Sequence, residues 1–144
     1  MDWVRYLAEL WRKEQELCDT LGAIAGRHGD EPDVSGMCKL LAAWSEAHVM
    51  LLAGWLGTGS SGGVIAEADG SGVGARWMHE FQHAWLTVAD VHVRWAVVHQ
   101  TAAATHDAAL LKLSIAALGH SQRQMAWLLA RLKEAAPAQW MDAA

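Results

Sequence analysis

The sequence predicts an all-α four-helix bundle, and three observations support this prediction. Ala accounts for 27 of the 144 residues, whereas Val and Ile together number 13. Because Ala and Leu favour helices and β-branched residues favour strands, this composition indicates a helical protein. Apolar residues recur every three or four positions in four separate segments, as on the buried face of a helix. The chain length corresponds to one domain, at roughly 100–200 residues per domain.

The first two predicted helices cover residues 2–26 and 32–56. The first ends near Gly26 and Gly29. The second opens with Pro32 and Asp33, which suit a first turn because proline needs no N–H donor there and an acid favours the positive end of the helix dipole. The apolar faces of the two helices carry Trp3, Leu7, Leu10, Trp11, Leu17, Cys18, Leu21, Ile24, Met37, Cys38, Leu41, Trp44, Leu51, Leu52 and Trp55.

Residues 57–74 hold seven of the 13 glycines, which predicts a long flexible connection rather than a helix. A simple up-down bundle would need only a short loop here, whereas a ferritin-like bundle needs a crossover that runs the length of the bundle. Eighteen extended residues reach ~55–60 Å, and a helix of twenty-odd residues is ~30 Å long. Both topologies are therefore open, and the length of the connection favours the crossover.

The third predicted helix, residues 75–104, is apolar on two opposite faces. Its buried stripe consists of Trp77, Phe81, Trp85, Val88, Trp95 and Ala102. Leu86, Val93 and Val97 lie on the opposite side. A helix that is apolar almost all round is usually covered all round, so we expect a homodimer in which this helix contacts the second subunit. The fourth predicted helix, residues 106–135, follows a cap at residues 105–107 and stops before Pro137.

The charge balance and the cysteine usage exclude several classes of protein. Sixteen acidic and eleven basic residues give a net charge of −5, and the sequence has no basic cluster for a nucleic acid to bind. Cys18 and Cys38 lie within helical patterns, which is typical of core thiols in a reducing compartment. The charged amino terminus does not resemble a signal peptide, and the longest uncharged stretch, residues 47–66, is too rich in Gly and Ser to span a membrane. We therefore expect a cytoplasmic protein with no membrane span and no nucleic-acid partner.

Polar side chains interrupt the apolar faces at the middle of the predicted bundle. Glu14 lies on the inward face of the first helix, His48 lies at a similar height on the second, and His92 lies on the buried stripe of the third. A carboxylate and imidazoles from different helices form a ligand set for Zn, Fe or Mn. We therefore predict a metal site at Glu14, His48 and His92, or a small-molecule ligand in the same layer. Haem held by the imidazoles of His48 and His92 is a further alternative.

A different interpretation needs no cofactor. An unpaired buried carboxylate is costly, so Glu14 could simply accept hydrogen bonds from His48 or His92. The polar layer, which also contains Ser45 and Ser121, would then only set the register of the helices. The protein would be a structural or protein-interaction module, and nothing in the sequence names a reaction.

Other His and Trp residues are interpreted as structural. His79, Glu80 and His83 spell H-E-x-x-H, in which two imidazoles one turn apart can share a zinc ion. They lie off the buried stripe, and neither a sheet nor a third downstream ligand is readable, so we expect a solvated or interface face. His120 lies on the flank of the fourth helix, where we expect it to pack. Seven of the nine Trp residues fall on or beside the inward faces and are interpreted chiefly as core filling, namely Trp3, Trp11, Trp44, Trp55, Trp77, Trp85 and Trp95.

Three stretches of the sequence carry a resemblance to a known group of proteins. They are residues 27–34 after the first helix, residues 43–48 in the second and residues 132–137 at the end of the fourth. In these stretches the chain resembles bacterial ferritin-like four-helix proteins without an assigned activity. The resemblance implies a ferritin-like bundle with a central ligand site.

Di-iron ferritin-like proteins carry a Glu on the first and third helices and an E-x-x-H pattern on the second and fourth. By this resemblance Glu14 matches the first Glu, and His48 matches the His of the second helix. Ser45 stands where the second helix would carry its Glu, Val88 occupies the mid-height position of the third helix, and residues 121–124 replace the last pattern. The resemblance therefore implies a reduced ligand set.

Overall fold

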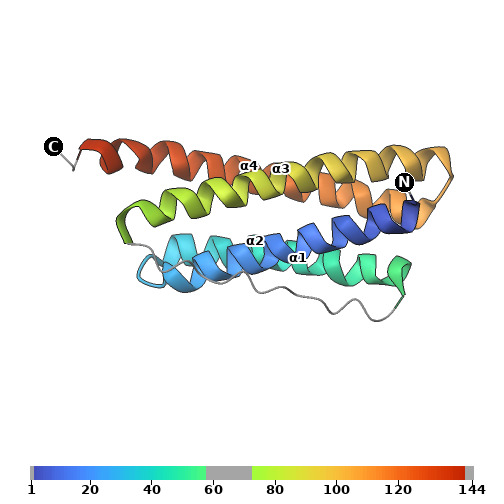
Figure 1. Cartoon of the computed structure of the whole chain (residues 1–144), viewed down its shortest axis with the longest axis horizontal. Coiled ribbons are helices and arrows are strands. Elements are labelled where there is room, and N and C mark those ends of the chain that lie inside the picture. Colours follow the sequence, from blue (N-terminus) through green and yellow to red (C-terminus); the bar gives the residue numbers. More distant parts are fainter. Residues whose placement is uncertain (1, 58–72, 142–144) are drawn as a thin grey trace.

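The computed structural model describes residues 2–57 and 73–141 and confirms an all-helical four-helix bundle. Its helices are α1 (Trp3–Arg27), α2 (Pro32–Leu56), α3 (Val73–Ala104) and α4 (Ala108–Met141), which lie along one long axis (Figure 1). The described residues contain no strand, as the composition predicted. Most of the predicted glycine-rich connection, residues 58–72, lies outside the described residues. No described helix combines the length and the hydropathy that a bilayer crossing requires.

The helices form two hairpins, α1 with α2 and α3 with α4. The hairpins pack on each other through α1 with α3 and through α2 with α4, whereas the backbones of α2 and α3 do not approach each other closely in the described part of the chain. Arg27, at the end of α1, pairs with Glu80 near the start of α3, and Glu9 pairs with Arg94 at 3.2 Å. Helices α1 and α3 are therefore antiparallel, so α2 and α3 run in the same direction (Figure 1). The end of α2 and the start of α3 lie at opposite ends of the bundle, which excludes the up-down alternative.

Local capping explains where the helices begin. The side chain of Asp2 accepts a hydrogen bond from the backbone N–H of Val4 at 3.1 Å, and Pro32 occupies the first turn of α2. The side chain of Asp107 accepts from the backbone N–H of Leu110 at 3.1 Å, so α4 begins at residue 108.

The carboxyl end of α4 differs from the prediction. The helix continues through Pro137 to Met141, beyond the predicted end at residue 135. A proline this close to a helix end removes one backbone hydrogen bond, but few helical residues follow it. The indole N–H of Trp77 donates to the side-chain oxygen of Gln139 at 2.9 Å, and this contact ties the last turns of α4 to α3.

Leu side chains dominate the centre of the bundle, and large aromatic side chains close its edges. Trp95 is 0% exposed, whereas most of the other Trp residues are only partly buried against the core. Trp140 is 68% exposed. Core filling therefore describes Trp95 well, while the partly buried Trp residues cover the margins of the core.

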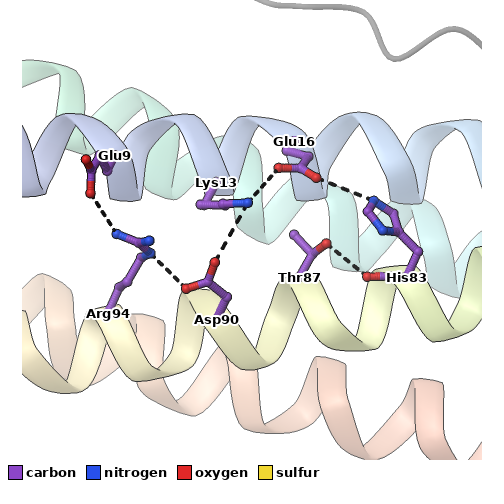
Figure 2. A network of polar contacts seen from close by, with 7 residues as sticks. All are labelled: Glu9, Lys13, Glu16, His83, Thr87, Asp90 and Arg94. Atoms are coloured by element: carbon purple, nitrogen blue, oxygen red, sulfur yellow. Dashed lines mark hydrogen bonds and ion pairs between the residues drawn. The ribbon is translucent and has the colours of Figure 1, made fainter.

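Charged side chains alternate along the contact between α1 and α3 (Figure 2). Arg94 lies between Glu9 and Asp90, at 3.2 and 2.8 Å. Lys13 lies between Asp90 and Glu16, at 3.8 and 3.3 Å. Because each cation lies between two carboxylates from different turns, this polar ladder matches only the antiparallel register seen here. The ladder consists of Glu9, Arg94, Asp90, Lys13, Glu16 and His83.

Candidate functional site

The middle of the bundle contains a buried pair formed by Glu14 of α1 and His48 of α2. Glu14 is 0% exposed and His48 is 3% exposed. The ring nitrogen Nδ1 of His48 is hydrogen-bonded to Oε2 of Glu14. The indole N–H of Trp95, from α3, donates to the same oxygen at 3.1 Å. Three helices therefore converge on one carboxylate oxygen, and two of the three predicted metal ligands are in direct contact.

His120 of α4 extends this pair into a chain of three side chains. Nε2 of His48 lies 2.9 Å from Nδ1 of His120, and the two rings meet nearly edge to edge, with centroids 5.1 Å apart. His120 therefore does more than the packing we expected, because its ring also contacts the buried Glu14–His48 pair. His120 lies about one helical turn before Gln124, which is buried against α2. Because side chains one turn apart lie on the same face of a helix, this spacing indicates that His120 also faces α2.

The hydrogen-bond pattern assigns a proton to each contact. When both rings are neutral, His48 donates its Nδ1–H to Glu14 and receives the Nδ1–H of His120 at Nε2. The outer nitrogen of His120, Nε2, then keeps its lone pair. Burial lowers the pKa of His120, the neighbouring His48 and Arg123 act in the same direction, and Glu14 opposes them. This direction favours the neutral form of the His120 imidazole.

Gln124 is a further buried residue of the layer that the sequence patterns did not single out. Its side-chain N–H group donates to the backbone oxygen of Leu41 at 2.9 Å and to the hydroxyl of Ser45 at 3.0 Å. These bonds connect α4 to α2 one turn away from His48. Among the described residues, neither Oε1 of Gln124 nor Oε1 of Glu14 has a hydrogen-bond partner, although both atoms are buried. The layer therefore contains two acceptor oxygens that a bound donor or cation would satisfy.

His92, the third predicted ligand, has a different partner. Its Nδ1 lies 2.6 Å from the hydroxyl of Ser121 on α4, and that hydroxyl donates to the backbone oxygen of Leu118 at 3.1 Å. The structure brings Glu14 and His48 together but pairs His92 with Ser121. Residues 2–57 and 73–141 contain no group of three His, Cys, Asp or Glu side chains arranged around one metal position. A metal site at Glu14, His48 and His92 therefore stays a prediction.

The H-E-x-x-H stretch is engaged in ion pairs between helices. Glu80 pairs with Arg27 of α1 and with Arg76, the latter at 3.3 Å. His83 lies 3.4 Å from Glu16, and His79 is exposed. These contacts agree with the expected solvated face and hold the amino-terminal part of α3 against α1.

Comparison with known proteins supplies no relative for this chain. Searches against protein-family models, curated proteins and solved structures returned no match. Functional inference therefore depends on the contacts described above.

Proposed function

We propose that the protein binds a transition-metal ion or a small ligand at its mid-bundle Glu/His layer. The observation that carries the proposal is the Glu14–His48–His120 chain. A ligating His commonly donates its other ring N–H to a carboxylate, which sets the tautomer and orients the ring. Glu14 holds His48 in this way and leaves Nε2 of His48 directed at Nδ1 of His120.

The facing nitrogens of His48 and His120 are the donor atoms that this arrangement favours. The proton on Nδ1 of His120 would move to the outer nitrogen of that ring, Nε2, when the ion binds. Imidazole nitrogens suit Zn and Fe, and water could complete the coordination because His120 is only partly buried. Glu14 would then act behind His48 as the carboxylate that orients it. His92 could join such a site only by leaving the hydroxyl of Ser121.

The helix directions support a ferritin-like arrangement, but the side chains do not supply a di-iron ligand set. Helices α2 and α3 run in the same direction, as a crossover bundle requires. Ser45 and Ser121, at positions where di-iron proteins carry carboxylate or imidazole ligands, are buried and hydrogen-bonded to Gln124 and His92. We therefore propose one ion per chain rather than a di-iron centre.

A cobalt titration of protein purified without an affinity tag tests this function. We expect one Co²⁺ per chain, with the visible absorption of a nitrogen-ligated ion, and competition by Zn²⁺. His48→Ala and His120→Ala should abolish binding, and Glu14→Gln should weaken it about 10–100-fold. His79→Ala is the matched control, because His79 is exposed and remote from the layer. Loss of binding in His92→Ala would instead assign the third ligand to His92.

A second candidate function is a structural module in which the layer only sets helix register. It is favoured by the pairing of Gln124 with Ser45 and of His92 with Ser121, each across two helices. This candidate predicts that the protein contains no stoichiometric metal and that a chelator leaves its melting temperature unchanged. The same cobalt titration therefore separates the two functions.

We also propose a homodimer in which α3 packs against α3 of a second copy. Leu86, Val93 and Val97 are 63, 62 and 42% exposed on the outer face of α3. Large exposed apolar side chains that form one stripe mark interaction surfaces.

A further inference from the structure

The Glu14–His48 pair is enclosed on the side where α1 meets α3. Both residues are almost completely buried, and the polar ladder joins α1 to α3 along this contact (Figure 2). The two hairpins are also tightly packed within themselves. Of the four contacts between neighbouring helices in the described chain, the one between α2 and α4 is the least extensive. The contact between α2 and α4 is therefore the least tightly closed of the helix contacts around His48.

Two rings lie beside the buried imidazole at this contact. The ring of His120 meets that of His48 nearly edge to edge, with Nδ1 of His120 2.9 Å from Nε2 of His48 and an interplanar angle of 23°. The indole of Trp44 stacks on the face of His120, with centroids 4.6 Å apart and an interplanar angle of 15°. Both Trp44 and His120 are partly exposed, whereas His48 is buried. His120 therefore covers Nε2 of His48, and Trp44 packs on the face of His120.

Trp44 is held in this position by packing. Within the described residues its indole takes part in no hydrogen bond, whereas His120 is hydrogen-bonded to His48. Its neighbours along α2, Ala43 and Ala47, are small and exposed. A stacked ring without hydrogen bonds is a weaker restraint than the buried contacts of Glu14.

We propose that Trp44 controls access to the mid-bundle layer: outward rotation of its indole uncovers His120 and admits a ligand to His48 between α2 and α4. This inference rests on the proposed function, because it names the entry route of the same site. It assigns a specific role to a Trp that the sequence patterns assign to core packing.

Carbethoxylation by diethyl pyrocarbonate tests this inference without any metal. The reagent acylates accessible imidazoles, and peptide mass spectrometry measures the rate for each His. In the wild-type protein we expect exposed His79, His83 and His106 to react fast and His48 to react slowly. Trp44→Ala should accelerate the reaction of His48 by about tenfold or more, because the reagent no longer depends on outward rotation of the Trp44 indole. The matched control Trp55→Ala, on the same helix and also partly buried, should leave that rate within about twofold of wild type.

Two further variants separate the loss of the cover from the loss of the fold. Trp44→Phe keeps a ring over His120 and should react at close to the wild-type rate, whereas Trp44→Leu should behave like Trp44→Ala. Circular dichroism confirms that each variant is folded. A wild-type rate for His48 in both Trp44→Ala and Trp44→Leu would overturn the inference, and so would an equal acceleration of His92. A failed cobalt titration would remove the proposed function without changing this outcome.

Discussion

At the scale of single residues, Glu14 is the group on which the mid-bundle layer depends. One of its oxygens accepts from both His48 and Trp95, so its removal leaves two buried donors without an acceptor. A buried donor that is left without its acceptor typically costs about 1–3 kcal/mol.

This pairing predicts a non-additive double mutant. Glu14→Ala should lower the free energy of unfolding by about 3 kcal/mol, because it leaves two buried donors without an acceptor. The double variant Glu14→Ala/His48→Ala should lose less stability than Glu14→Ala alone, because it leaves no imidazole without its partner. Urea denaturation measures all three variants. A double variant as destabilised as the sum of the two single variants would show that the two side chains do not act as a pair.

The two thiols predict a loss of stability at alkaline pH. Burial raises the pKa of Cys38 to about 11, and burial followed by the nearby carboxylates of Glu46, Asp19 and Glu14 raises the pKa of Cys18 to about 11. Above the ordinary thiol pKa the unfolded chain loses these protons before the folded chain does. Stability should therefore be present below about pH 8.5 and should fall as the pH rises toward 11.

Thermal melts at pH 8 and pH 10.5 measure this effect. A Cys18→Ala/Cys38→Ala variant should show a smaller loss of melting temperature between the two pH values than the wild-type protein. An identical loss in both proteins would assign the alkaline sensitivity to other groups, such as Tyr6, whose pKa is also raised by burial.

At the scale of elements, the turn between α3 and α4 holds a strained residue. His106 has a φ of +58°, in the left-handed region that favours glycine. This conformation allows the N–H of Asp107 to reach the backbone oxygen of Ala102 at 3.0 Å, which closes the end of α3.

Glycine at this turn should therefore stabilise the protein. His106→Gly removes the steric cost of a side chain in the left-handed region and should raise the free energy of unfolding by about 1 kcal/mol. Thr105→Gly is the matched control; because Thr105 has no positive φ, it should be neutral or destabilising. Chemical denaturation compares the two variants, and a destabilised His106→Gly would mean that the imidazole makes a contribution larger than the backbone cost.

The polar ladder between α1 and α3 predicts a small, salt-dependent effect. Lys13 lies between Asp90 and Glu16, and each of the three side chains is more than a third exposed. Lys13→Gln should cost about 0.5 kcal/mol at low salt, and the difference from wild type should vanish in about 1 M NaCl, because salt screens exposed charges. Lys112→Gln, an exposed position on α4, is the control, and a cost that persists at high salt would argue against an electrostatic origin.

At the scale of the whole molecule, the outer face of α3 predicts the oligomeric state. Light scattering coupled to size exclusion should give the mass of a dimer for the wild-type chain. Val93→Lys should give a monomer, because it places a charge at the centre of the proposed contact. Ile115→Lys changes a side chain that is similarly exposed on α4 and should remain dimeric. A monomeric wild-type chain, or a dimer that Val93→Lys leaves intact, would remove α3 as the interface.

Much of the architecture could be predicted from local sequence patterns. Helices α1 and α2 begin and end within about a residue of the expected bounds, because Pro32 and the glycines act through the backbone alone. The end of α4 was missed, since the contact between Trp77 and Gln139 that supports the turns around Pro137 joins residues far apart in the chain. His120 was assigned to packing for the same reason: its partners His48 and Trp44 come from another helix.

The sequence by itself determined the helical class, the four segments and the burial of Glu14 and His48, because composition and periodicity are properties of each segment alone. Only the tertiary structure decided that α2 and α3 run in the same direction, that His48 contacts His120, and that His92 pairs with Ser121 instead. Helical periodicity states which face of a helix is buried. The rotation and height of one helix against the next depend on contacts such as the α1/α3 ladder, and these select the partner that each buried polar side chain meets.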